Sequence, residues 1–263
     1  MHKQYNTNEY RNHAVFTQLK EYTSFYEHLS TSMVNWIVGG TRAINFETYL
    51  FSSIQGTLES INAILAIGRI NDAVALMRKY YDAIIIHTYA SLYLQDKLPV
   101  QEIIVKKIDD WIAGAQKIPE YREMSEYIKA SDRLKEVNEV FFAGNKYKEI
   151  RKRCNSHVHY NFFQYMFLND NDVYNENRIE HLNMLSENLT DLFTMHFIYT
   201  FMVNEHYMSS SDYMDHLDVG SIPIEDSQYW VAPFVQETFS TVIKQYQPQL
   251  ANILKDTTCM HLD

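Results

Sequence analysis

Residues that break helices and form turns are scarce in this chain. Its 263 residues include only 7 glycines and 5 prolines. A β-sandwich needs frequent turns, and a nucleotide-binding α/β fold needs glycine-rich loops, so this composition argues against both classes. Hydrophobic residues make up 46% and charged residues 21%, which is ordinary for a globular protein. We therefore expect an all-α fold with a full hydrophobic core.

Cysteine is also scarce. Cys154 and Cys259 are the two in the sequence, which excludes a disulfide framework, and no pair of cysteines has the spacing of a zinc finger. The sequence contains no His-Glu-x-x-His motif and no Glu-x-x-His pair of the kind that builds a di-metal bundle. The prediction is that the protein has no metal site and uses no cofactor.

Long hydrophobic runs are missing as well. The most apolar stretch, residues 192–203, contains His196 and falls short of the roughly 20 apolar residues that a membrane span needs. The first ten residues have no apolar core of the kind found in a secretory signal. We expect a cytoplasmic protein that does not enter the membrane.

The net charge of −10 is unevenly distributed. Residues 1–160 carry 20 Lys and Arg against 18 Asp and Glu, whereas residues 161–263 carry 3 against 15. An acidic surface repels nucleic acid, so any contact with RNA is expected in the first part of the chain. The acidic C-terminal third either keeps its surface hydrated or contacts a protein partner.

Apolar residues at helical spacing predict a series of helices. In the second of them, Ile54, Leu58, Ile61 and Leu65 form one stripe, and Asn71 is expected to cap the third. The second and third form a long antiparallel hairpin, the expected centre of the fold. The predicted helices span residues 10–37, 44–67, 72–94, 100–115, 120–129, 132–142, 146–159, 176–208, 213–217, 233–245 and 248 onward. We interpret residues 1–210 as a helical bundle and residues 211–263 as a C-terminal helical extension packed on it.

The most specific segment is residues 146–161, where cationic side chains precede two histidines and two asparagines. A guanidinium grips phosphate, and imidazole is the side chain best suited to moving protons near neutral pH. Metal-free cleavage of RNA needs both abilities together. The candidate catalytic residues are Arg153, Asn155, His157 and His159. The candidate RNA-binding residues are Lys146, Lys148, Arg151, Lys152 and Tyr160, the last by stacking on a base.

Helical spacing sorts these residues by face. Arg153 and His157 are four residues apart and share a face, as do Asn155 and His159. Arg153 and His159 are six apart, which places them about 120° apart on an unbroken helix. They converge only if the helix ends or bends near Val158, or if a second copy of the protein supplies one of them.

The run from Arg153 to His159 resembles the Arg-(four to six residues)-His signature of HEPN domains. The resemblance extends to Ser60-Ile61 and to residues 68–73 and 76–79. HEPN domains are helical bundles, and many are metal-independent ribonucleases of the abortive-infection or toxin type that act as dimers. The resemblance implies that Arg153 binds the scissile phosphate and that His159 takes part in proton transfer from the ribose 2′-hydroxyl, leaving a cyclic phosphate. Asn155 is a typical polar residue inside the signature.

The register of the signature is ambiguous, because Arg151 and His157 also have five residues between them. In addition, Cys154 follows Arg153 at a position where active members often have Asn, Asp or His. The sequence therefore leaves two Arg–His pairs open.

Two function classes follow. The leading hypothesis is a metal-independent endoribonuclease or RNA-binding HEPN-like protein, in phage defence or a toxin–antitoxin pair, with RNA as ligand and a homodimer as the working form. The alternative is a non-catalytic helical protein-interaction module of a bacterial cytoplasmic protein, in which the cations form internal salt bridges. Either class allows a protein partner or antitoxin to bind through the C-terminal third.

Other residues are expected in the core. We interpret His87, which follows three isoleucines, as a buried histidine with one hydrogen bond, and Cys154 as a buried thiol. Phe162 and Phe163 are also expected to pack inside. Arg78 is expected to pair with Asp72 or Asp82.

Overall fold

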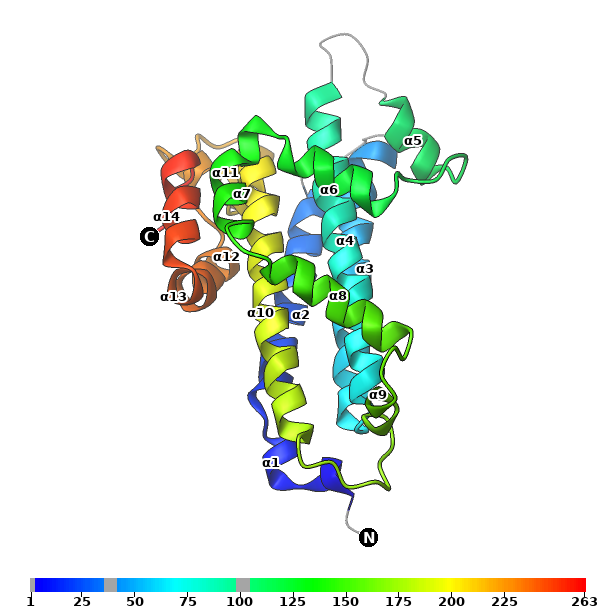
Figure 1. The fold of residues 1–263 in the computed structure, drawn as a ribbon. Helices are drawn as coiled ribbons and strands as arrows, with labels where there is room; N and C mark the ends of the chain where they lie inside the picture. The colour runs from blue at the N-terminus through cyan, green and yellow to red at the C-terminus, as the bar shows by residue number, and fades with distance from the viewer. Residues whose placement is uncertain (1–2, 36–41, 98–104) are drawn as a thin grey trace. The chain divides into compact units, whose positions relative to one another are not determined.

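The computed structural model describes residues 3–35, 42–97 and 105–263, and over these residues the protein is all-α (Figure 1). The described residues contain no strand, and Ser209 and Val231 form an isolated antiparallel bridge. The fold class predicted from composition is therefore confirmed. None of the helices in the described part combines the length and the apolar character that crossing a bilayer requires.

The helices follow the predicted series closely, with several changes at their ends. Their bounds are α1 Asn8–Arg11, α2 Ala14–Asn35, α3 Arg42–Ala66, α4 Ile70–Lys97, α5 Lys106–Ile112, α6 Tyr121–Lys129, α7 Lys135–Phe141, α8 Lys146–Val158, α9 Gln164–Phe167, α10 Arg178–Val203, α11 Asp212–Asp218, α12 Pro233–Thr238, α13 Lys244–Tyr246 and α14 Pro248–Thr257. Short helical turns lie between some of them, among them η2 Asp132–Leu134, η3 Glu205–Met208 and η5 Phe239–Ile243. The predicted stop at residues 39–40 and the predicted start at residue 100 lie outside the described residues.

The chain forms two compact units, each assembled from three separate stretches. Unit 1 comprises residues 1–27, 50–84 and 142–193, and unit 2 comprises residues 28–49, 85–141 and 194–263. The boundary predicted at residue 210 falls inside unit 2, which contains residues 194–263 of the acidic C-terminal third. Sequence pattern did not indicate this interleaving, because it arises from long helices that pass from one unit to the other.

Unit 1 has a core of aliphatic stripes and aromatic contacts. The stripe Ile54, Leu58, Ile61 and Leu65 of α3 is fully buried, as predicted. Tyr22 of α2 stacks on Phe193 of α10 with ring centroids 3.8 Å apart. Each buried aromatic side chain removes a large apolar area from water, which is the main stabilising term of such a core. Tyr26 and Tyr80 are also buried, and their hydroxyls satisfy each other at 2.8 Å.

The turn between α3 and α4 is tight. Gly68 has φ +78°, and a side chain there would collide with the Asn171 Oδ1 atom, so the position favours glycine. The predicted cap is wrong: Asn71 lies inside α4, and Asn169 instead accepts a hydrogen bond from the backbone N–H of Asp72 at 3.3 Å. A residue remote in sequence has taken the capping role, which local pattern cannot reveal.

In unit 2 the long helix predicted to reach residue 208 ends earlier, at Val203. Asn204 leaves the helical conformation at φ −133° and ψ 78°. Its side chain donates to the buried carboxylate of Glu47 at 3.4 Å and accepts from Gln95. These contacts favour a break in the helix, and η3 follows it, so Glu205 and His206 are held in a short turn instead of on a helical face.

Candidate functional site

The candidate site lies on α8, which runs unbroken from Lys146 to Val158. One stripe of this helix is buried and consists of Tyr147, Ile150, Cys154 and His157. These positions follow the spacing i, i+3, i+7, i+10, which is the pattern of a helix face turned to a core. His157 is thus the last residue of a buried stripe, and this spacing was present in the sequence.

His157 is only 1% exposed and is held on two sides. Its Nδ1 atom lies 2.9 Å from the Asn71 side-chain oxygen, and its ring stacks on Tyr165 at 3.9 Å between centroids. Burial, followed by the nearby His181 and Arg153, lowers the pKa of His157 to about 4. A neutral imidazole that is hydrogen-bonded and stacked in this way serves the fold.

Arg153 is half-buried on α8 and points its guanidinium at α10. Its Nη1 donates to the Asn188 side-chain oxygen at 3.2 Å. This is the one side-chain hydrogen bond that Arg153 makes among the described residues, whereas a guanidinium carries five N–H donors. Its partner is an amide and not a carboxylate, so the positive charge is not neutralised by this contact.

Asn155 is joined to a second arginine. Arg78 on α4 donates from Nε to the Asn155 side-chain oxygen at 2.8 Å and forms an ion pair with Asp82. The predicted ion pair of Arg78 is therefore found, with Asp82 as the acid. The contact joins Asn155 to the guanidinium of Arg78. The spacing of the Arg–His signature does not predict this contact, because Arg78 lies on another helix.

His159 lies at the C-terminal end of α8 and is exposed. Its backbone N–H still bonds to the Asn155 carbonyl at 3.1 Å, so His159 follows the helical path by one residue beyond Val158. The chain then turns at Tyr160, whose φ is +47° and whose side chain is 40% exposed. His159 therefore presents its imidazole to solvent, whereas His157 does not.

The predicted RNA-binding cations divide by environment. Lys146 pairs with the nearly buried Asp191 at 2.9 Å, and Lys152 pairs with Glu149 at 3.8 Å across an exposed helix face. Lys148 is exposed, and Arg151 is half-buried. Exposed pairs such as Lys152–Glu149 are weak and yield readily to a phosphate.

An aromatic series leads from the core to the surface beside His159. Phe162 contacts Tyr165, which stacks on the buried His157, and Phe163 contacts Phe167. The prediction that Phe162 and Phe163 pack inside is wrong, because they are 56% and 70% exposed. The reason is α9, a short helix that sequence pattern did not indicate and that carries Met166 and Phe167 on the surface too. Val158, Tyr160, Phe162, Phe163, Met166 and Phe167 are called the α8–α9 apolar surface below.

The structure places the histidines of the two candidate registers in opposite environments. Arg153 and His157 lie toward the interior of unit 1, whereas His159 and Tyr160 lie at the open end of the helix. Arg153 and His159 do not share a face within one chain, since α8 is regular to Val158. The pairing of an arginine with His159 stays a prediction.

Cys154, next to Arg153, is buried as predicted. Burial raises the pKa of the thiol to about 12, although Arg78 and Arg153 oppose this effect. A thiol in this state is neither a nucleophile nor a metal ligand at neutral pH. Cys154 is therefore interpreted as a core residue of the buried stripe of α8.

Unit 2 contains a buried polar cluster that sequence reasoning missed in part. His87 is buried as predicted, with Nδ1 2.9 Å from His196 and Nε2 3.3 Å from the Glu47 carboxylate, which also accepts from Ser91 and Tyr207. Burial alone raises the pKa of Glu47, but its hydrogen bonds to His87, Ser91 and Tyr207 outweigh this and lower it. Burial and the nearby His87 hold the pKa of His196 well below its usual range. Glu47, His87, Ser91 and His196 are buried and Tyr207 is partly buried, so we assign the cluster to the stability of unit 2.

No family model, curated protein or solved structure matches this chain. The described residues define an all-α protein in which α8 carries the buried His157 and the exposed His159 follows directly after the helix. Assigning a function within this class depends on the residues of α8 and on His159.

Proposed function

We propose that this protein is a HEPN-like RNA-binding protein that cleaves RNA at the end of α8 without using a metal ion. The observation that supports this most directly is the exposed imidazole of His159, directly after the helix that carries Arg153, Lys148 and Lys152. Asn188 uses one of the five donors of Arg153, which leaves donors for a phosphate oxygen.

The proposed chemistry is transesterification. His159 removes the proton of the ribose 2′-hydroxyl, the 2′-oxygen attacks phosphorus, and the bond to the 5′-oxygen breaks. The leaving 5′-oxygen takes up a proton from water, which the imidazolium of His159 replaces, and the products are a 2′,3′-cyclic phosphate and a free 5′-hydroxyl. Arg153 stabilises the charge on the phosphoryl oxygens throughout.

We place the arginine and the histidine of one site on two copies of the protein. Because Arg153 and His159 diverge on one helix, a complete site needs the arginine of one protomer and the histidine of the other. The α8–α9 apolar surface lies next to His159 and offers the contact area for such a homodimer, since large exposed apolar groups mark interaction surfaces. At the rim of the dimer, Tyr160 stacks on a splayed base.

Purified protein incubated with total RNA and EDTA tests the activity. We expect cleavage to products ending in a cyclic phosphate, and we expect His159→Ala to reduce the rate by about 10²–10⁴-fold, the usual contribution of a general base. His216→Ala removes a histidine that bonds Ser221 on the surface of unit 2 and is the matched control. Unchanged cleavage by His159→Ala would exclude His159 as the catalytic base.

A mixing experiment tests the dimer. Arg153→Ala and His159→Ala proteins are each expected to be inactive, and their mixture is expected to regain part of the parent rate, because one of the two sites in a mixed dimer is then intact. If each site were built within one chain, the mixture would stay inactive. Sedimentation of the parent protein gives the oligomeric state independently.

The toxin-type role in phage defence or in a toxin–antitoxin pair is part of the same proposal. It predicts that expression arrests growth and that His159→Ala relieves the arrest. A protein partner would bind in the C-terminal third, where residues 217–224 expose Leu217, Val219, Ile222 and Ile224 among acidic side chains. Such a surface suits a partner with apolar and basic residues.

A non-catalytic interaction module is the second candidate. The internal contacts of Asn155 with Arg78 and of Lys146 with Asp191 favour it, as does the α8–α9 apolar surface. In this case RNA would remain uncut, and Phe163→Asp would abolish association while His159→Ala would change nothing.

A further inference from the structure

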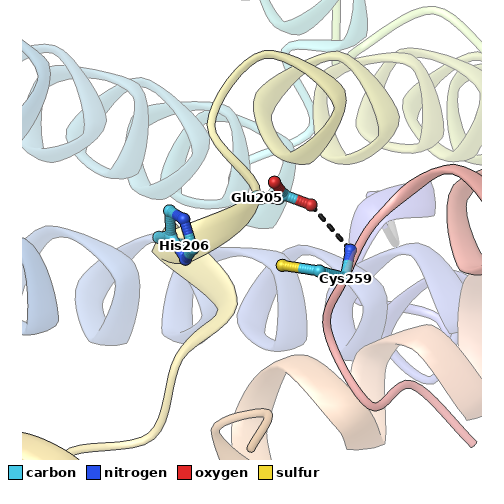
Figure 2. A group of neighbouring side chains, drawn as sticks. All are labelled: Glu205, His206 and Cys259. Atoms are coloured by element: carbon cyan, nitrogen blue, oxygen red, sulfur yellow. Dashed lines mark hydrogen bonds between the residues drawn. The ribbon is translucent and has the colours of Figure 1, made fainter. Parts of the chain in front are cut away.

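Three side chains of the kinds that bind metal ions meet in unit 2, far along the chain from α8. Glu205 and His206 belong to η3, and Cys259 lies just beyond α14. The carboxylate oxygen, the imidazole nitrogen and the sulfur all lie within 4.8 Å of one another. Figure 2 shows the sulfur of Cys259 pointing from the C-terminal segment toward the turn that carries the other two side chains.

The backbone on both sides of this cluster is held in place. The N–H of Cys259 donates to Glu205 Oε2 at 2.8 Å, which leaves the second carboxylate oxygen for another contact. The N–H of His261 donates to the Tyr229 carbonyl at 2.9 Å, and that of Ala232 to the Met208 carbonyl at 2.7 Å. The flanking side chains Met208, Met260 and Leu262 are buried. The three ligands thus come from anchored segments, which lowers the entropy cost of bringing them together.

The ligand set matches a particular class of cation. Zinc binds thiolate sulfur, imidazole nitrogen and carboxylate oxygen, whereas magnesium and calcium take oxygen ligands. In a tetrahedral zinc site the ligand atoms are about 3.3–3.6 Å apart, so separations up to 4.8 Å close with small side-chain rotations. The surrounding sequence favours a cation as well, because residues 161–263 carry 15 acidic against 3 basic side chains.

We propose that Glu205, His206 and Cys259 bind a divalent cation of the zinc class, which fastens the C-terminal segment to the turn after α10. Three protein ligands leave the fourth position to water, and the exposed His206 and Cys259 give the ion a path from solvent. The role is structural and does not depend on RNA cleavage. Motif spacing, on which the prediction of no metal site depends, does not reveal this set, because Cys259 is 53 and 54 residues from the other two members and the set matches no zinc motif.

A reactive thiol is the competing reading of Cys259. Partial burial and the Glu205 carboxylate raise the pKa of Cys259, and a thiolate next to a carboxylate is disfavoured in the absence of a cation. A bound zinc ion reverses this effect, since it displaces the thiol proton.

Cobalt substitution provides the test. Titration of the full-length protein with Co²⁺ is expected to produce a thiolate-to-cobalt charge-transfer band in the near ultraviolet and the strong visible bands of a tetrahedral ion. Zinc is expected to displace the cobalt, to protect Cys259 from a thiol reagent and to raise the melting temperature. Cys259→Ser should abolish the charge-transfer band, and Glu205→Gln and His206→Asn should each weaken zinc binding more than about tenfold.

Control variants outside the cluster show whether zinc binding depends on these three side chains. His216→Asn, outside the cluster, should bind zinc like the parent, and Cys154 cannot supply the band because it is buried. The three ligands lie at the surface, so the variants are expected to melt like the parent in the presence of a chelator. A charge-transfer band that survives in Cys259→Ser, or a parent protein that gives no band, would overturn the proposal.

Discussion

Two histidines separated by a single residue lie in opposite environments. His157 is 1% exposed, stacked on Tyr165 and bonded to Asn71, whereas His159 is exposed at the end of the same helix. Both belong to one His-Val-His sequence, and both fit an Arg–His signature in one register or the other. Two residues rotate a helix by about 200°, so one of them faces the core when the other faces solvent.

The comparison shows that residue type and spacing alone do not identify a catalytic histidine. His157 has a pKa lowered to about 4 and stays neutral inside the fold. His159 is exposed to solvent because it lies directly after the end of α8, and not because of its position in the Arg–His signature.

Lowering the pH should destabilise the folded protein through His157. The pKa of His157 is about 4 in the folded protein and 6.5 ordinarily, so below pH 6.5 the unfolded chain binds a proton that the folded protein does not. The free energy of unfolding therefore falls as the pH drops from 6.5 to 4, by about 3 kcal/mol from this group. His157→Gln should remove that part of the pH dependence, as measured by urea unfolding across this range.

His159→Gln is the control for this measurement and should keep the pH dependence of the parent. His196 contributes in the same direction in all three proteins, because its pKa is also lowered in the fold. Identical pH dependence in His157→Gln and the parent would show that His157 is solvated in solution.

Removing Asn71, the hydrogen-bond partner of His157, should also lower the free energy of unfolding. Asn71→Ala removes the side chain that lies 2.9 Å from Nδ1 and leaves a buried imidazole nitrogen without that hydrogen bond. We expect a loss of about 1–3 kcal/mol in unfolding free energy. Asn161→Ala, which removes an exposed contact with Ser156, should change it by less than about 0.5 kcal/mol. Equal losses in the two variants would remove the basis for assigning His157 to the core.

Exposed cations should have the smallest effect on stability and a visible effect on binding. Lys148→Gln and Lys152→Gln should each change the unfolding free energy by less than about 0.5 kcal/mol. If each lysine contacts a phosphate, each change should reduce the slope of log K against log salt for single-stranded RNA by about 0.7. Lys244→Gln on α13 is the control, and a slope that falls equally there would indicate non-specific attraction.

Much of the fold was predictable from the sequence because apolar stripes are local. The stripe of α3 and the bounds of α6 and α8 follow from spacing alone. The end of α10 does not, since Asn204 is drawn out of the helix by Glu47, a residue far away in sequence. The cap of α4 by Asn169 is another case, because no local signal marks it.

The candidate site was predictable in composition and not in arrangement. The sequence indicated which helix carries the arginines and histidines. His157 continues the helical spacing of Tyr147, Ile150 and Cys154, and this spacing is typical of a buried face. The contact between Arg78 and Asn155 and the exposure of Phe162 depended on tertiary structure. The cluster of Glu205, His206 and Cys259 depended on how the C-terminal segment returns to η3.

Arg178, at the start of α10, gives the region beside α9 one further property. It is 2% exposed and donates to the Gly68 carbonyl at 3.3 Å, the Asp170 carbonyl at 2.8 Å and the Asn171 side chain at 3.1 Å. These bonds tie the loop after α9 to the turn between α3 and α4. A ligand that docks beside this loop meets a shape already fixed during folding, so association does not have to freeze it and little affinity is lost to ordering.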